Sequence, residues 1–193
     1  ILRHDPNVIM VGEIRDAETA EISVQAALTG HLLLASLHTN DAPTAIPRLF
    51  DLGVPPFLAA SVLNVVIAQR LVRKICRSCI YSYEVGPGLE ETIRDELKEL
   101  RVEVENLRVP KLLYRGRGCH NCGSTGYHGR IGIFEVLPVT DTIKKLITDP
   151  RVDLDALLKE ARRAGMKPMF EDGMTKAELG ITTLEEVMRV IRE

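Results

Sequence analysis

The sequence is poor in aromatic side chains and in net charge. None of its 193 residues is tryptophan, aromatic side chains make up 4%, and the formal net charge is −2. Stacking surfaces for single-stranded nucleic acid need aromatic side chains, and general attraction to phosphate backbones or anionic lipid needs positive charge. We therefore expect no nucleic acid among the partners of this chain.

Long hydrophobic runs are missing as well. The longest candidate, "PFLAASVLNVVIAQRLV", is interrupted by Asn64 and Gln69, and it falls short of the roughly 20 apolar residues that a membrane span needs. The chain begins with Ile1 rather than methionine and runs almost at once into an apolar segment. We therefore expect a piece of a longer protein, for which a missing signal peptide proves little about the parent.

The first 75 residues alternate between strand-like and helix-like segments. The pattern predicts buried strands at 7–11 and 31–39, and helices at 17–29, 42–52 and 57–71. Asp16 is placed to cap the first helix, and Ile22 belongs to its expected apolar stripe. Strands and helices that alternate in this way indicate an α/β fold with a parallel sheet.

The composition changes at Cys76. A charged, largely exposed helix is expected over 87–107, a strand over 130–137, and helices over 152–165 and 183–193. The last helix opens with Thr183 and Glu186, the spacing of a capping box.

The only four cysteines form two C-x-x-C pairs, Cys76 with Cys79 and Cys119 with Cys122, with 39 residues between the pairs. Two such knuckles supply the four thiolates of a tetrahedral zinc site. Because protein ligands would fill all four positions, we expect a structural zinc rather than a catalytic one. Two disulfides, or four buried thiols, are the alternatives.

Glu13 follows the first predicted strand in "VIMVGEIRD", and Arg15 follows it closely. Ligands of open α/β sheets bind at the carboxyl ends of the strands, where a carboxylate can hold Mg²⁺ or orient an attacking water. His31 begins the second predicted strand and His38 ends it, so parallel strands would place His38 at the same edge as Glu13. A solvated loop acid and a loop histidine with ordinary partners are the alternatives.

These segments together resemble a known family. "LRHDPNVIMVGEIRDAETA" and "ALTGHLLLASLHTNDAPTAIPRLFDLGVPPFL" resemble the Walker B and histidine-box regions of the ATPases of type II secretion and type IV pilus assembly. "AQRLVRKICRSC" and "CHNCGSTGYHGRIGIFEVL" resemble the tetracysteine module of the same proteins. Retraction motors of this family generally lack the four cysteines, so the resemblance is to the assembly and secretion branch.

The resemblance implies a cytoplasmic, hexameric ATPase with a RecA-like motor domain, peripheral to the inner membrane. Glu13 matches the Walker B glutamate that positions water and Mg²⁺, and His38 matches the histidine that faces ATP. His31 and Arg15 are further candidates for contact with the nucleotide. The cysteines match the ligands of a structural Zn²⁺. The partners implied are an inner-membrane platform protein and cytoplasmic recruitment proteins.

The same resemblance divides the chain into three parts. Residues 1–75 would be the C-terminal part of the ATPase core, 76–128 the zinc module, and 129–193 a returning strand with a C-terminal helical segment. The zinc module would hold the fold together, with docking of the platform protein as an added role.

One element of such a motor is missing. No glycine in the chain is followed by lysine, so the sequence contains no G-x-x-x-x-G-K-[ST] phosphate loop. We expect this loop upstream of Ile1 in the parent, and negligible ATP hydrolysis by the present chain alone. We also expect its open sheet edge to cause dimerisation or aggregation.

Two other readings remain open at this stage. A zinc ribbon that binds protein or nucleic acid is supported by the basic segment "RLVRKICR". A metal-dependent hydrolase could be built from His31, His38 and Glu13, but their seven-residue offset would put the two histidines on opposite faces of a strand.

Overall fold

The computed structural model describes residues 6–99, 108–149 and 153–192, and the chain forms two compact units. The first unit comprises residues 1–68 and 135–167, and the second comprises residues 69–134 and 168–193. Two of the three boundaries fall within paired strands, β3 (Val65–Ile75) and β6 (Tyr127–Pro138), so each strand contributes to both units. These units are defined by contacts within the chain, whereas the three parts expected from the sequence are defined by function. The division into three functional parts therefore remains a prediction.

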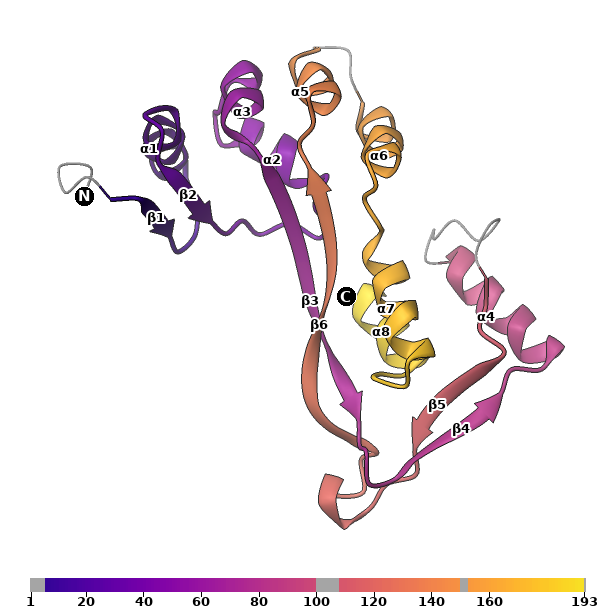
Figure 1. The fold of residues 1–193 in the computed structure, drawn as a ribbon. Helices are drawn as coiled ribbons and strands as arrows, with labels where there is room; N and C mark the ends of the chain where they lie inside the picture. Colours follow the sequence, from indigo (N-terminus) through magenta and orange to yellow (C-terminus); the bar gives the residue numbers. More distant parts are fainter. Residues whose placement is uncertain (1–5, 100–107, 150–152, 193) are drawn as a thin grey trace. The chain divides into compact units, whose positions relative to one another are not determined.

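The first unit contains a parallel strand pair and five helices among its described residues. Its elements, besides parts of β3 and β6, are β1 (Val8–Val11), α1 (Ala17–Leu28), β2 (Leu32–Ala35), α2 (Ala45–Asp51), α3 (Pro56–Val62), α5 (Asp141–Thr148) and α6 (Leu154–Arg163) (Figure 1). β1 and β2 are parallel, with Val8 opposite Leu32 and Val11 opposite Ala35. The predicted parallel α/β arrangement is therefore confirmed for this pair, although β2 is shorter than expected.

Helix α1 begins and ends where the sequence predicts. The Asp16 side chain accepts the backbone N–H of Thr19 at 2.8 Å, which satisfies one of the free amides of the first turn. Gly30, with φ of +94°, adopts a left-handed conformation that glycine tolerates best. Ile22 was expected in the buried stripe, but its side chain is 55% exposed, and alanines and Val24 form the buried face instead.

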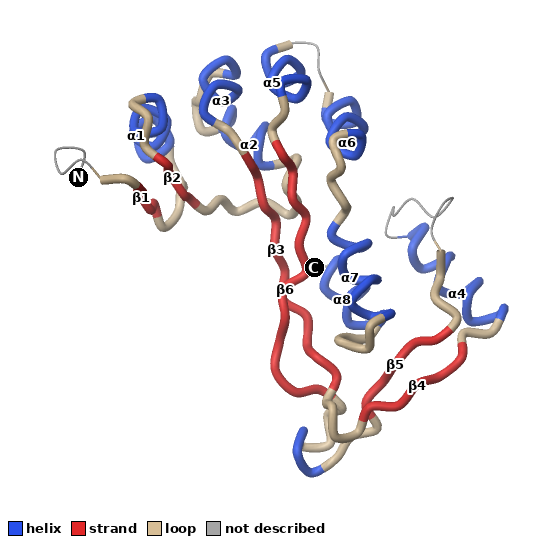
Figure 2. Tube along the Cα trace, viewed as in Figure 1, coloured by secondary structure: helices blue, strands red, loops and turns tan. Residues whose placement is uncertain are grey.

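The helix predicted over 57–71 is wrong in its second half. Helix α3 ends at Val62, and strand β3 begins at Val65 (Figure 2). Side chains from Val65 to Leu71 alternate between exposed and partly buried, as in a strand. The segment opens with Val65, Val66 and Ile67, whose branched side chains favour strands, and pairing with the distant β6 settles the outcome.

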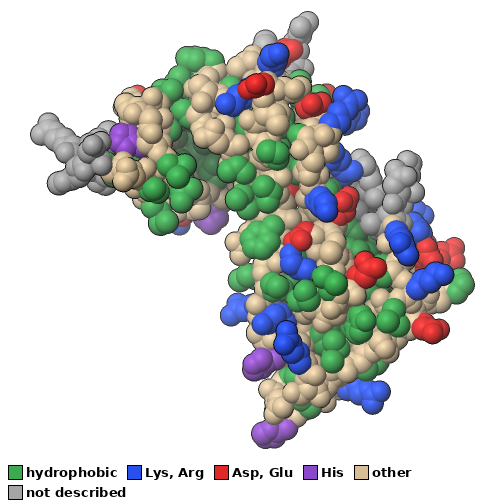
Figure 3. All heavy atoms as spheres, viewed as in Figure 1, with side chains coloured by type: hydrophobic (Ala, Val, Ile, Leu, Met, Phe, Trp, Pro, Cys, Tyr) green, Lys and Arg blue, Asp and Glu red, His purple; other side chains and the backbone are tan. Residues whose placement is uncertain are grey.

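The core of the first unit lies beneath its helices. Buried side chains from α2, α3 and α5 pack with Leu137 and Val139 at the end of β6. The strand pair β1–β2, in contrast, carries the exposed apolar side chains of Val8, Met10, Leu32 and Leu34. Figure 3 shows hydrophobic side chains on the surface of the molecule.

The second unit combines an antiparallel strand pair with three α-helices among its described residues. Its further elements are β4 (Ile80–Glu84), α4 (Pro87–Glu99), β5 (Leu112–Gly116), a short 3-10 helix (His120–Cys122), α7 (Met169–Glu178) and α8 (Leu184–Arg192). β4 and β5 pair from Ile80 opposite Gly116 to Glu84 opposite Leu112. The predicted charged helix is confirmed as α4 up to residue 99, with Ile93 and Leu97 buried, and its expected continuation over 100–107 lies outside the described residues.

The predicted capping box of α8 is half formed. The Thr183 hydroxyl accepts the backbone N–H of Glu186 at 3.2 Å, as expected. The Glu186 carboxylate does not return to the cap. It is 1% exposed, and it accepts the backbone N–H and the guanidinium of Arg73 on β3 as well as the guanidinium of Arg189. The acid therefore joins α8 to β3.

Candidate functional site

Glu13 lies just beyond the carboxyl end of β1, and its backbone is held on both sides by Ser36. The N–H of Ile14 donates to the Ser36 carbonyl at 2.9 Å, and the Ser36 hydroxyl donates to the Gly12 carbonyl. Ser36 was not among the predicted site residues. Its position directly after an apolar strand, next to the predicted histidine, is the only sequence feature that pointed to it.

The Glu13 carboxylate contacts two side chains, a histidine and an arginine. Its Oε1 lies 2.5 Å from Nε2 of His38, and its Oε2 lies 2.6 Å from Nη2 of Arg15. His38 is three residues past the end of β2 rather than at its last position, yet it meets Glu13 at the predicted edge of the sheet. The hydrogen bond from Arg15, followed by the charges of Arg15 and His38, outweighs desolvation and lowers the pKa of Glu13. Glu13 is therefore held as a carboxylate, the form that accepts a proton or binds a metal cation.

His31 does not join this group. Its Nδ1 lies 3.1 Å from the Ala26 carbonyl and 2.9 Å from the Thr29 hydroxyl, so its ring is placed at the end of α1. His31 also lines a cleft of about 620 Å³ in the first unit, together with Thr39, Asp41 and side chains of α1, β2 and β3. Glu13, Arg15 and His38 do not line that cleft.

A shared metal at the two histidines has no support in this geometry. Among residues 6–99, 108–149 and 153–192, the group of side chains close enough to hold one ion consists of the four cysteines. The hydrolase reading, which needs His31, His38 and Glu13 on one ion, is therefore not favoured.

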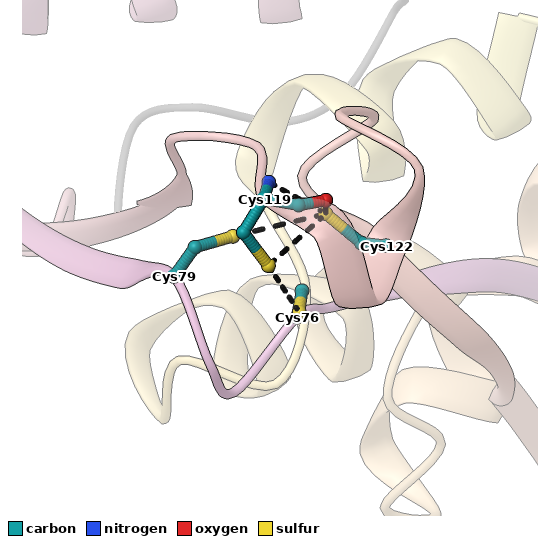
Figure 4. A group of neighbouring side chains, drawn as sticks. All are labelled: Cys76, Cys79, Cys119 and Cys122. Atoms are coloured by element: carbon teal, nitrogen blue, oxygen red, sulfur yellow. Dashed lines mark hydrogen bonds between the residues drawn. The ribbon is translucent and has the colours of Figure 1, made fainter.

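The four cysteine sulfurs converge from two segments of the second unit (Figure 4). All lie within 4.8 Å of one another, and the Sγ–Sγ distances include 3.8 Å for Cys76–Cys119, 3.9 Å for Cys79–Cys122 and 3.7 Å for Cys119–Cys122. A tetrahedron with Zn–S bonds of about 2.3 Å has edges of about 3.8 Å. The cysteines are free thiols here, and a disulfide would need sulfurs about 2.05 Å apart. The disulfide alternative is therefore wrong for this structure, and the spacing fits one tetrahedral ion.

The knuckle around Cys122 favours a thiolate. Burial would raise the pKa of this thiol, but the backbone N–H groups of Cys119 and Gly126, 3.2 and 3.3 Å from Sγ, help to lower the pKa to about 6. For the Cys79 thiol, burial outweighs a backbone hydrogen bond with Gly118, and its pKa is raised to about 12. Thiolate is the form that binds zinc. The amides of the second knuckle therefore favour the thiolate form of Cys122.

Two glycines let the strands around the second knuckle approach closely. A Cβ on Gly116 would lie 2.2 Å from the Gly126 carbonyl oxygen, closer than any side chain tolerates. His120, between the cysteines, is exposed and lies outside the group of possible ligands. The cluster is thus built from sulfur and backbone alone.

The chain has a mixed α/β fold with an acid–histidine contact beyond a strand end and a group of four cysteines that could hold a metal ion. The family model described as "Type II/IV secretion system protein" matches residues 1–189. The chain belongs to this family, and the resemblance seen in its motifs is confirmed.

Curated relatives and solved structures agree with this assignment. The chain is 51% identical over 188 residues to the type IV pilus assembly ATPase PilB of Thermus thermophilus, covering 97% of this chain and 20% of that protein. It is 46% identical over 193 residues to the type II secretion system ATPase E of Vibrio cholerae, covering 100% of this chain and 36% of that protein. The chain therefore spans about a fifth to a third of these relatives.

Solved structures of the same fold support the architecture. The pilus retraction motor PilT with bound ADP superposes with a TM-score of 0.61 at 25% identity, covering 98% of this chain and 40% of that one. The Legionella pneumophila ATPase DotB gives a TM-score of 0.63 at 21% identity, covering 99% and 40%, which shows the fold alone. No helix among the described residues is long and apolar enough to cross a membrane.

Proposed function

We propose that the chain is the C-terminal part of the motor domain of a cytoplasmic, hexameric ATPase that powers type II secretion or type IV pilus assembly. Family membership and relatives named as ATPases of these two systems support the proposal. The observation that carries it is the contact of Glu13 with His38, at 2.5 Å, beyond the carboxyl ends of two parallel strands. That edge is where open α/β sheets bind their ligands.

In this proposal Glu13 is the Walker B carboxylate. It is kept ionised by Arg15, so it can orient the attacking water and hold Mg²⁺ of the ATP complex through water. The His38 ring lies 2.5 Å from one carboxylate oxygen, and it is exposed, so that it would face the nucleotide. Phosphates would be cradled by a phosphate loop upstream of residue 1. His31 remains a candidate for a weaker contact with the nucleotide.

The four cysteines hold a structural Zn²⁺ in the same proposal. Their number, chemistry and spacing leave no open coordination position for water or substrate. The ion would fix the turns that join β3, β4, β5 and β6, and no step of ATP hydrolysis would involve it. The parent would act at the inner membrane with a platform protein and cytoplasmic recruitment proteins, and the zinc module could add a docking surface for the platform.

The enzymatic claim is tested on the protein extended upstream through its phosphate loop. Glu13→Gln removes the charge and keeps the shape, so ATP turnover should fall by about 100-fold or more. The matched control is Glu18→Gln, an exposed acid in the first turn of α1, which should leave turnover unchanged. Full turnover in Glu13→Gln, or full turnover by residues 1–193 alone, would contradict the proposal.

The role of the cysteines is tested with Cys76→Ser and Cys79→Ser in the same extended protein. Loss of folding together with loss of turnover supports the scaffold role. A folded variant that hydrolyses ATP but fails in secretion or pilus assembly would indicate that the main role of the cysteine module is docking.

A further inference from the structure

Glu135 is a buried acid that the proposed chemistry does not use. It lies on β6, in the part of that strand that belongs to the first unit, and it is 6% exposed. Its Oε1 accepts the backbone N–H of Ala42 at 2.9 Å, across 93 residues of sequence. Ala42 itself is fully buried. Burying a carboxylate costs free energy unless hydrogen bonds compensate for the lost water. A hydrogen bond between this carboxylate and a loop amide therefore needs a structural explanation.

The loop that ends at Ala42 is the one that carries His38. It leaves β2 after Ala35. At its start, Ser36 bonds to the backbone on both sides of Glu13. At its end, the Ala42 amide is bonded to Glu135. Hydrogen bonds thus hold the loop beside Glu13 and on β6, with His38 between the two points, and Leu37 and Ala42 also pack against the core of the first unit.

The bonds inside the loop shape it without tying it to β6. The Thr39 hydroxyl donates to the Asp41 carbonyl at 3.1 Å, and the Asp41 carboxylate accepts the Thr44 N–H at 2.8 Å. These contacts span two and three residues, so they fix a local turn and move with it. The bond to Glu135, in contrast, fixes the turn against a strand from elsewhere in the chain.

We propose that Glu135 is a positioning residue for His38. A charged acceptor makes a stronger hydrogen bond than a neutral one, and a buried amide that loses its acceptor becomes destabilising. Removing Glu135 therefore releases the Ala42 end of the loop, four residues beyond His38. The imidazole is then held less firmly in the position in which it contacts Glu13. The kinetic consequence rests on the proposed function, whereas the positioning itself does not.

Three variants separate positioning from a general loss of stability. Glu135→Gln keeps an acceptor oxygen and removes the charge. Glu135→Leu removes the acceptor and fills the space with apolar atoms. Leu137→Val, two residues further along the same strand and fully buried, weakens the core cluster to which Ala42 also belongs but leaves the acceptor of the Ala42 amide in place. If Glu135→Leu fails to fold, Glu135→Met replaces it, because its unbranched side chain follows the path of the glutamate.

The first readout is nuclear magnetic resonance of the 193-residue chain. Amide exchange at Ala42 should accelerate at least about tenfold in Glu135→Leu and much less in Glu135→Gln. The His38 ring resonances, assigned with His38→Gln, should move toward their positions in Glu13→Gln, in which the contact is lost. Leu137→Val should leave both unchanged. His38 resonances that stay at their wild-type positions while Ala42 exchange accelerates would overturn the proposal, as would an equal response in Leu137→Val.

The second readout is ATP turnover by the extended protein. Glu135→Leu should lower kcat about tenfold while KM for ATP changes less than about threefold, and Glu135→Gln should restore most of kcat. A parallel loss in Leu137→Val would mean a structural role only. If Glu13→Gln itself retains turnover, the proposed function fails, and the resonance experiment still decides whether Glu135 positions His38.

Discussion

The two candidate sites differ in how much solvent reaches them. The side chains of His38 and Arg15 are 81% and 74% exposed around Glu13, whereas Cys76 and Cys122 are 3% and 9% exposed. A group that meets a substrate must remain accessible, and a metal that only holds a fold is best enclosed by protein ligands. This difference in exposure agrees with the proposed division into a site for chemistry and a site for structure, although Glu13 itself is 21% exposed and Cys79 and Cys119 are only partly buried.

The sites also differ in what holds them together. The acid–histidine site depends on side-chain contacts and on loop anchors at Ser36 and Ala42. The cysteine cluster depends on backbone amides and on the close approach of Gly116 to Gly126. The first arrangement thus rests mainly on exposed side chains, and the second mainly on closely packed backbone.

Loss of the metal should produce the largest effect. Structural zinc contributes on the order of 10 kcal/mol to the folding of small modules, so Cys79→Ser, or chelation of the ion, should unfold β4, β5 and the knuckles while α1 keeps its amide protection. Hydrogen exchange measured element by element would show this. His120→Ala is the matched control and should retain the metal. Equal amide protection of β4 and β5 with and without metal would show that the metal does not stabilise this part of the fold.

The next largest effect belongs to the buried carboxylate of Glu186. Burial would raise the pKa of this acid, but hydrogen bonds from Arg189 and Arg73 lower the pKa to about 2. Because the pKa in the folded state is depressed, the stabilisation is complete above about pH 4.5 and is lost as the pH falls toward 2. We expect Glu186→Gln to cost about 2 to 3 kcal/mol at pH 7 and to flatten this acid dependence.

The comparison for Glu186 is its neighbour Glu185, an exposed acid that pairs with Arg115. Glu185→Gln should change the free energy of unfolding by less than about 1 kcal/mol. Urea unfolding at pH 7 and at pH 3 gives the free energy of unfolding of both variants. Similar losses in the two variants would show that burial of Glu186 has no energetic consequence.

The cap of α1 should give a smaller effect. Asp16→Ala removes the acceptor of the Thr19 amide and should destabilise the first unit by about 1 kcal/mol, with faster amide exchange in the first turn. Asp16→Asn keeps an acceptor and should recover most of that loss. The cap would be unimportant if Asp16→Ala exchanged like the wild type.

The smallest change in stability is expected at the open site. Arg15→Ala removes the hydrogen bond that does most to lower the pKa of Glu13, so the titration midpoint of the Glu13 carboxyl should rise. Carboxyl carbon resonances recorded against pH measure it. The stabilisation by this pair is present above the unfolded-state pKa of Glu13 and fades as pH falls through its lowered folded-state value. An unchanged midpoint would mean that Arg15 does not hold the carboxylate in solution.

Local patterns predicted the parts of the fold that local physics decides. The strand at 8–11, the capped helix α1 and the meeting of His38 with Glu13 follow from apolar runs, capping chemistry and the parallel arrangement of strands. The four-cysteine group follows from spacing alone. In these cases the interacting residues are close in sequence or share a regular pattern.

Long-range contacts account for what the sequence did not reveal. The run after α3 became strand β3 because it pairs with β6, some sixty residues later, and an apolar run alone does not separate a buried helix from a strand. Strand β4 was missed although Tyr81 and Tyr83 alternate in "IYSYE". Arg73 lies 113 residues from Glu186, and Ala42 lies 93 residues from Glu135, so these contacts are beyond the reach of any local pattern.

The central claim is that the four-cysteine centre is closed and that chemistry belongs to the open acid–histidine site. X-ray absorption at the zinc edge of the metal-loaded chain tests this most directly. The account predicts one zinc per chain with four sulfur ligands at about 2.3 Å. Three sulfurs with an oxygen or nitrogen neighbour would contradict it, because an open position would make the metal a candidate for the chemistry.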